Sequence, residues 1–385
     1  MRGQVAYGFN VTIHSPNRIA VGIRVWRWLE GTCPWLLLLC SGPVWLWTTI
    51  RREVYRRRWK STRKLSQPVV SVGNVTIGGT GKTPFVIWLA HRFQEAGRKV
   101  AILSRGYGRR LPSEYVIVSD GKQMQVSWQL SGDEPYLIAQ QCPGAIVAVG
   151  SNRYELGQWV NARFECDCFI LDDGFQHLQL HRDLNFVLLD ARDQKGLDGI
   201  FPAGHLREPL RSLMDATAIV LTRANSSDVA KPVLTQVNHA VGLGYEPIYV
   251  NFLLSSCWHL ASGMHESVDR FRNQRALVFS GIGNPQAFFD DVKAAGIDLV
   301  EEIQFADHFP YSARDMEEIR KVMKEQSIQV AFTTEKDAVK IAEWVRAEDP
   351  IWVMSVELKI SQGADMLLQL MHGLPWKIKR ETSRA

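Results

Sequence analysis

The segment from residue 68 to residue 104 constrains the fold of this chain more than any other. An apolar run, PVVSVGNV, leads through a glycine-rich loop into a stretch with helical periodicity that begins at Lys82 and stops at Gly97. A second apolar run, KVAILS, follows. This order predicts a strand, a helix and a further strand. Such units build a parallel sheet with right-handed crossovers.

The loop between the first strand and the helix ends in the triplet GKT, which matches the P-loop pattern. In that pattern, backbone N–H groups and the helix N-terminus bind the phosphates of a nucleotide. The general pattern has a glycine five residues before Gly81, where this chain has threonine. We expect the phosphates of ATP to bind at Thr76, Ile77, Gly78, Gly79, Thr80, Gly81, Lys82 and Thr83. The alternative is a glycine-rich turn that only caps the helix.

Side-chain roles follow from the same pattern. Lys82 would reach the β- and γ-phosphates, and the hydroxyl of Thr83 would bind Mg²⁺. The apolar run CFILDD ends in Asp172 and Asp173. The carboxyl ends of parallel strands lie at one edge of the sheet, so these carboxylates are predicted to reach the same Mg²⁺. The alternative is an ordinary turn that ends a strand.

Alternating strands and helices continue along the chain. Further strands are expected at AIVAVG, NFVLLD and AIVLTR, and helices near residues 134–141, 154–162 and 207–214. A new alternation begins at residue 276, and 385 residues suffice for about two domains. We predict an α/β protein with a P-loop NTPase-like parallel sheet domain at 67–230. A second, smaller α/β domain at 231–385 would close the active-site cleft.

The first 66 residues are expected to form a membrane-associated helical segment. Residues 33–50 are apolar and uncharged but are interrupted by prolines, and a basic run follows them from Arg51 to Lys64. A crossing helix needs about 20 apolar residues, so this segment is expected to lie in the interface and face anionic headgroups. A buried amphipathic helix with a solvated basic face is the alternative. A cleaved signal peptide is disfavoured because the cations follow the apolar run.

Composition excludes several classes of protein. The net charge of +5 is modest and gathers in that basic run, so a nucleic-acid-binding face is not expected. Six cysteines are scattered without a CxxC pair, which indicates reduced thiols and neither a disulfide nor a zinc site. No obligate protein partner is predicted.

Seven motifs together resemble the ordered motifs of the lipid A 4'-kinases, the tetraacyldisaccharide 4'-kinase family. They span nearly all of residues 67–340, and the family shares the threonine at the start of the loop. The motifs are SVGNVTIGGTGKTP (71–84), SRGYG (104–108), GDEP (132–135), LDDGFQH (171–177), FPAGHLREPL (201–210), FSGIGNP (279–285) and DHFPYS (307–312).

The resemblance implies transfer of the ATP γ-phosphate to the 4'-hydroxyl of a tetraacylated glucosamine disaccharide 1-phosphate. It implies a peripheral or monotopic protein on the cytoplasmic face of the bacterial inner membrane. It also implies that Asp133 and His308 act as a pair across a cleft between two domains. A sugar hydroxyl must lose its proton to accept phosphate, so Asp133 would be the base and His308 would orient it. Without the resemblance, Asp133 could simply begin a helix and His308 could be structural.

Four further polar residues are weaker candidates for the substrate site: Arg105, His177, Arg207 and Glu208. Arg105 would meet phosphate, and His177 would support the aspartate pair. Arg207 and Glu208 would pair with each other or line the substrate site. The competing function is a membrane-associated P-loop GTPase or ATPase switch, but the NKxD-type guanine reader of a GTPase is missing. A transporter subunit would need an ABC-type signature, which is also missing.

Overall fold

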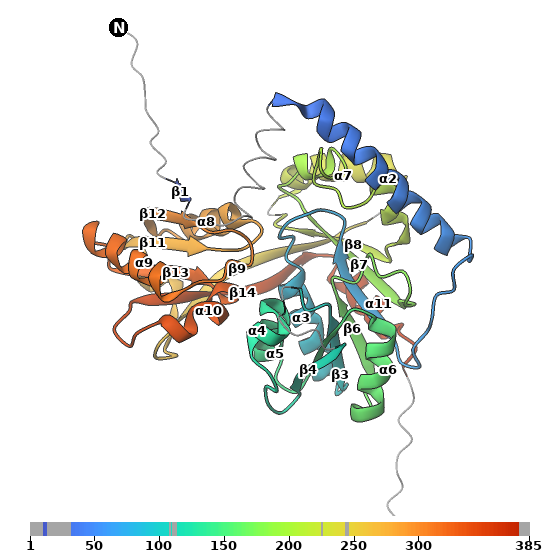
Figure 1. The fold of residues 1–385 in the computed structure, drawn as a ribbon, viewed down its shortest axis with the longest axis horizontal. Coiled ribbons are helices and arrows are strands. Elements are labelled where there is room, and N and C mark those ends of the chain that lie inside the picture. The colour runs from blue at the N-terminus through green and yellow to red at the C-terminus, as the bar shows by residue number, and fades with distance from the viewer. Residues whose placement is uncertain are drawn as a thin grey trace, which may run out of the picture. The chain divides into compact units, whose positions relative to one another are not determined.

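The computed structural model describes residues 11–13, 32–107, 109, 114–224, 226–242 and 246–376. The chain has a mixed α/β fold with mostly parallel strands (Figure 1). It divides into two compact units. Unit 1 comprises residues 1–25 and 253–357, and unit 2 comprises residues 26–252 and 358–385.

Unit 2 contains a sheet in which neighbouring strands are parallel except at one edge, where β4 pairs antiparallel with β5. The central strands are buried along their whole length, as expected for a parallel sheet covered on both faces. The strand order is β9 (Ile248–His259), β8 (Ala218–Thr222), β7 (Leu184–Asp190), β2 (Val69–Asn74), β6 (Cys168–Asp172), β3 (Val100–Ser104), β5 (Ile146–Gly150) and β4 (Tyr115–Asp120).

Side chains alternate between the two faces of this sheet. Val70 and Ile170 belong to the core beneath α3, α5 and α11, whereas Val69 and Phe169 pack with α6. The helices of unit 2 are α2 (Pro34–Arg56), α3 (Lys82–Glu95), α4 (Trp128–Ser131), α5 (Asp133–Gln141), α6 (Arg153–Phe164), α7 (Ser227–Val241) and α11 (Ala364–His372), with 3₁₀ turns η1 (Lys195–Leu197) and η2 (Leu210–Asp215).

Unit 1 is a smaller α/β unit. Its parallel strands lie in the order β1 (Val11–Ile13), β12 (Asp298–Gln304), β11 (Arg275–Ser280), β13 (Val330–Thr334) and β14 (Ile351–Gln362). The short β10 (His265–Ser267) pairs antiparallel with β9. The helices are α8 (Pro285–Ala294), α9 (Ala313–Glu325) and α10 (Glu335–Ile341), with 3₁₀ turns η3 (Val268–Phe271) and η4 (Ala342–Trp344).

The extents of the two units differ from the expected segments 1–66, 67–230 and 231–385. Strands β9 and β14 each run from one unit into the other, and the C-terminal helix α11 packs into the core of unit 2. Each unit is therefore built from two separate stretches of the chain, which a division into consecutive segments does not reproduce. The α-helix expected near 207–214 is wrong, because the chain bends at residues 207 and 208 and only the 3₁₀ turn η2 forms after Pro209.

Helix α2 is a long helix on the outside of unit 2 (Figure 1). Its apolar side chains are largely exposed, and four positions at spacings of four and seven residues are buried. Within the described residues, no helix is both long enough and apolar enough to cross a bilayer. The large apolar side chains that are exposed are Trp35, Leu36, Leu38, Leu39, Trp45, Leu46, Trp47 and Ile50, and the buried residues are Leu37, Ser41, Thr48 and Arg52.

Candidate active site

The loop after β2 is held by its carbonyl groups. Gly81 begins α3 with φ +82°, and the ring of Phe252 lies where a β-carbon would point. Three side chains donate to successive carbonyls of the loop. The bonds are Asn74 Nδ2 to Gly78 O at 3.5 Å, Arg223 Nη1 to Gly79 O at 3.2 Å and Thr222 Oγ1 to Thr80 O at 3.0 Å.

The N–H groups of the same loop have no such partners. Within the described part of the chain, no acceptor is bonded to the backbone N–H of residues 78–82. The loop therefore presents unpaired donors at the N-terminus of α3, where the helix dipole is positive. Unpaired N–H groups at a helix N-terminus are the arrangement that binds anions such as polyphosphates.

The two aspartates at the end of β6 have different surroundings. Asp172 is 2% exposed and accepts a hydrogen bond of 2.8 Å from Ser104. Asp173 is half-buried and lies between two cations, with Lys82 Nζ at 3.5 Å and Arg207 Nη1 at 3.0 Å. Lys82, Asp173 and Arg207 thus form one charged cluster beside the loop.

These surroundings separate the two pKa values. Burial raises the pKa of Asp172 to about 7, with further contributions from the charges of Glu134 and Asp173 and an opposing one from Ser104. Burial also tends to raise the pKa of Asp173, but Lys82 and Arg207 outweigh it and lower that pKa to about 2. Asp173 is therefore ionised at neutral pH, whereas ionised Asp172 is a poorly compensated buried charge.

A divalent cation fits this donor set. Mg²⁺ takes hard oxygen ligands, and Asp172, Asp173 and Thr83 offer two carboxylates and a hydroxyl. A cation would also compensate Asp172, whose described partner is the hydroxyl of Ser104.

The motifs GDEP and SRGYG pack against each other through two glycines. A β-carbon on Gly132, which has φ +94°, would lie 2.8 Å from the carbonyl oxygen of Tyr107. One on Gly106 would lie 2.9 Å from the carbonyl oxygen of Ser131. Close backbone approach therefore holds Arg105 and Asp133 on neighbouring loops of unit 2. Asp133 is 5% exposed, opens α5, and accepts a bond of 3.0 Å from the N–H of Glu134.

His308 lies in unit 1 in a left-handed conformation with φ +58°. Its N–H donates to Gly281 O at 3.1 Å, and its Nε2 lies 3.5 Å from Lys336 Nζ. Buried Asp337 accepts hydrogen bonds from Ser280 Oγ and from the N–H of Gly281. It therefore holds Gly281, whose carbonyl accepts the bond from His308. Asp133 and His308 belong to different units, and their pairing stays a prediction.

Arg207 and Glu208 do not pair with each other. Arg207 binds Asp173, and Glu208 is 4% exposed and binds Arg52 of α2. Arg207 N donates to Val75 O, which holds this residue beside the loop, and the chain bends at Arg207 and Glu208, whose side chains reach different partners.

Sequence reasoning missed three charged residues near the loop. Asp190 ends β7, Arg223 follows β8, and the two pair at 2.7 Å. Arg153 begins α6 and is 5% exposed. Burial and the charge of Arg105 lower the pKa of Arg153 to about 10, although the charges of Asp173 and Asp172 act to raise it. Asp190 and Arg223 share one signal, a charged residue at or directly after the end of a buried strand, as in LLD and LTR, whereas Arg153 lies at the start of a helix.

His177 is a neutral, partly buried histidine. Its Nε2 is buried without a hydrogen-bond partner among the described residues. Burial and the nearby cations Arg153, Arg182, Arg51 and Arg105 lower its pKa to about 3. His177 therefore adds no positive charge beside Asp173 at neutral pH.

This pKa makes folding stability sensitive to acid. Below about pH 6.5 the unfolded chain protonates this histidine and the folded chain does not, so stability is full above pH 6.5 and falls as the pH falls toward 3. One proton corresponds to about 1.4 kcal/mol per pH unit. We expect His177→Asn to lose less stability than the parent between pH 6.5 and 5, measured by urea unfolding at each pH. If the unfolding free energies of the parent and of His177→Asn fell in parallel with pH, His177 would be protonated in the folded state as well.

Three comparisons with known proteins agree. The family model for LpxK, tetraacyldisaccharide-1-P 4'-kinase, matches residues 33–372. The chain is 36% identical over 310 residues to tetraacyldisaccharide 4'-kinase of Geobacter sulfurreducens, covering 80% of this chain and 85% of the relative. It is 37% identical over 322 residues to the enzyme of that name from Syntrophus aciditrophicus, covering 81% and 85%.

A solved structure also matches. It is a crystal structure of LpxK from Aquifex aeolicus in complex with ATP, with a TM-score of 0.70 and 31% identity. The match covers 88% of this chain and 98% of that one.

Proposed function

The chain belongs to the tetraacyldisaccharide-1-P 4'-kinase family, and we propose that residues 76–83 together with Asp133, Asp172, Asp173 and Arg207 carry its reaction. It is an ATP-binding kinase, a tetraacyldisaccharide 4'-kinase of lipid A biosynthesis. The observation that carries the proposed site is the loop whose carbonyls are held and whose N–H groups are unpaired.

In the proposed mechanism the phosphates of ATP bind the loop N–H groups and Lys82. The 4'-oxygen of the lipid disaccharide attacks the γ-phosphorus, its proton passes to Asp133, and the bond from the γ-phosphorus to the bridging oxygen breaks to release ADP. Lys82 and Arg207 stabilise charge on the phosphate oxygens. Asp172, Asp173 and Thr83 would hold Mg²⁺, which supplies further positive charge there.

His308 would assist Asp133 by orienting and polarising its carboxylate. The turn that carries His308 is rigidly bonded, which favours a positioning role. Arg105 would bind substrate phosphate, because its loop packs against the loop of Asp133. His177 would line the same region as a neutral donor or acceptor.

We further propose that the protein binds peripherally or monotopically to an anionic membrane surface, at the cytoplasmic face of the bacterial inner membrane. The exposed tryptophans and leucines of α2 support this location, since indoles favour the headgroup region and the adjacent cations favour anionic lipid. The lipid substrate, a tetraacylated disaccharide 1-phosphate, resides in such a membrane.

One experiment tests both parts. The purified protein is given ATP labelled on the γ-phosphate, Mg²⁺ and the disaccharide 1-phosphate in vesicles with or without anionic lipid. We expect label on the disaccharide, transferred faster in anionic vesicles. Hydrolysis of ATP with no labelled lipid would favour the nucleotide switch. Equal transfer in both vesicle types would contradict the anionic membrane surface.

A further inference from the structure

The buried side of helix α2 is mostly polar. Three of its four buried residues, Ser41, Thr48 and Arg52, carry polar side chains. A helix that served only as an anchor would gain little from burying an arginine, because removing a guanidinium from water is costly unless it is paired. The pairing of Arg52 therefore indicates what this side of the helix does.

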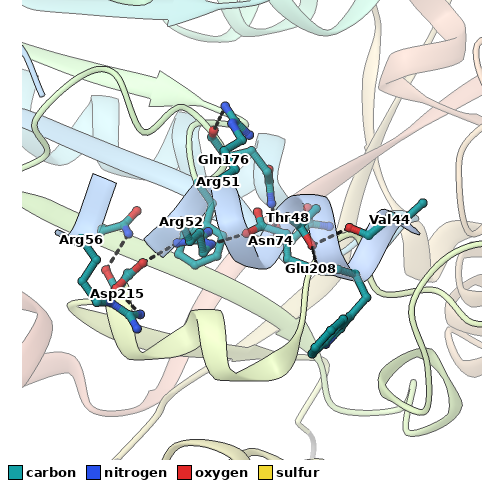
Figure 2. Close-up of polar contacts among 12 residues, drawn as sticks. Val44, Thr48, Arg51, Arg52, Arg56, Asn74, Gln176, Glu208 and Asp215 are labelled. Carbon is teal, nitrogen blue, oxygen red and sulfur yellow. Dashed lines mark hydrogen bonds and ion pairs between the residues drawn. The ribbon is translucent and has the colours of Figure 1, made fainter. Parts of the chain in front are cut away.

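Arg52 makes three interactions with the body of unit 2, and Figure 2 shows the polar ones. Its Nε donates to Oε2 of Glu208, and its Nη1 donates to Oδ2 of Asp215 at 2.5 Å. The guanidinium also lies 4.3 Å from the ring centroid of Phe175. We call Arg52, Glu208, Asp215 and Phe175 the Arg52 network. The other oxygen of Glu208 is buried without a partner among the described residues, so Arg52 compensates this carboxylate.

The Arg52 network adjoins the phosphate-binding loop. Glu208 follows Arg207, whose N–H donates to Val75 O at 2.7 Å, and Ile77 N donates to His205 O at 2.7 Å. Residues 205–208 are thus paired with the start of the loop, and the Arg207 side chain reaches Asp173. Moving Glu208 would move Arg207 with it.

Two further residues of α2, Arg51 and Ser41, bond to segments around the loop. Arg51 Nη2 donates to Gln176 O at 3.0 Å, and Gln176 Nε2 donates to Asn74 O at 2.8 Å. Ser41 donates to Ile200 O at 2.7 Å and accepts from Ala203 N at 3.0 Å. One face of α2 is therefore bonded to segments 174–177 and 199–208, while its other face is exposed and apolar.

We propose that Arg52 is a positioning residue for phosphoryl transfer, which holds Arg207 against Asp173 through Glu208 and so links the membrane-facing helix to the phosphate-binding loop. This inference rests on the roles proposed above for Arg207 and Asp173. The consequence is that the same helix both faces lipid and fixes a cation that binds the transferred phosphate.

A double-mutant cycle on the full-length protein tests this proposal, with lipid substrate in detergent micelles so that membrane binding does not enter. We expect Arg52→Gln to lower kcat at least 30-fold with KM for the lipid changed less than threefold. In an Arg207→Gln background, Arg52→Gln should change kcat less than threefold, because Arg52 acts through Arg207. If the fold-losses in kcat of Arg52→Gln and Arg207→Gln multiplied fully in the double variant, Arg52 would have a general structural role, and the proposal would be overturned.

Two variants guard the interpretation. Arg52→Lys keeps the buried charge but loses the fork that binds two carboxylates, and it should fold and lower kcat about tenfold. Arg92→Gln removes an exposed arginine paired with Glu95 on α3 and should leave kcat unchanged. Wild-type kcat in both Arg52 variants beside an impaired Arg207→Gln would overturn only the Arg52 role. Wild-type kcat in Arg207→Gln would overturn the proposed role of Arg207 as well.

Discussion

Asp133→Asn should lower kcat about 10³-fold and leave the Kd for ATP within about twofold, since a positioned general base contributes roughly 10²–10⁴-fold to proton transfer. Asparagine keeps the shape of the side chain and its ability to begin a helix, but it cannot accept the proton of the 4'-hydroxyl. The loss should therefore fall on the chemical step. Labelled phosphate transfer gives kcat, and calorimetry gives the ATP affinity.

A matched control separates catalysis from helix initiation. Asp228 lies in the first turn of α7, as Asp133 does in α5, but it is exposed. Asp228→Asn should leave kcat and the unfolding temperature unchanged. If Asp133→Asn also turned over at the parental rate, Asp133 would be a helix-initiating residue and the base would have to be sought elsewhere.

The parts of the fold that could be predicted from sequence are those in which local pattern and burial coincide. The run before Thr76 is mostly apolar because β2 is buried on both faces. The glycine-rich loop could be placed because Gly81 occupies a left-handed conformation that a residue with a β-carbon rarely adopts. Helix α3 then begins at Lys82, as expected, and the family and its activity were indicated by the ordered motifs.

The parts that could not be predicted depend on tertiary partners. Sequence left open whether Arg207 and Glu208 pair, because the bend at these two residues, which no local pattern reveals, gives each a different partner. It also gave no reason to bury Arg52, since the two carboxylates that bind it lie more than 150 residues further along the chain. Arg153 and Arg223 were missed because a charged residue at the start of a helix or after the end of a strand belongs to no motif on its own.

Lys82→Ala should impair both binding and chemistry, lowering kcat about 10²–10³-fold and weakening ATP binding at least tenfold. Lys82 lies 3.5 Å from Asp173, is mostly buried and begins the helix that follows the loop, so we expect its ammonium group to bind the phosphates held there. Without it, Asp173 is left with Arg207 alone, and charge developing on the phosphate oxygens loses a nearby partner. Calorimetric titration with ATP and single-turnover transfer measure the two effects separately.

Lys82→Arg provides the control because it keeps the charge while replacing a compact ammonium with a planar fork. It should retain most of the ATP affinity and recover only part of kcat. The two substitutions are expected to differ, since Asp133→Asn should leave ATP binding nearly unchanged whereas Lys82→Ala should weaken it. Parental ATP affinity in Lys82→Ala would mean that the triphosphate does not bind at residues 76–83, and the roles assigned to Asp172, Asp173 and Arg207 would then lose their common basis.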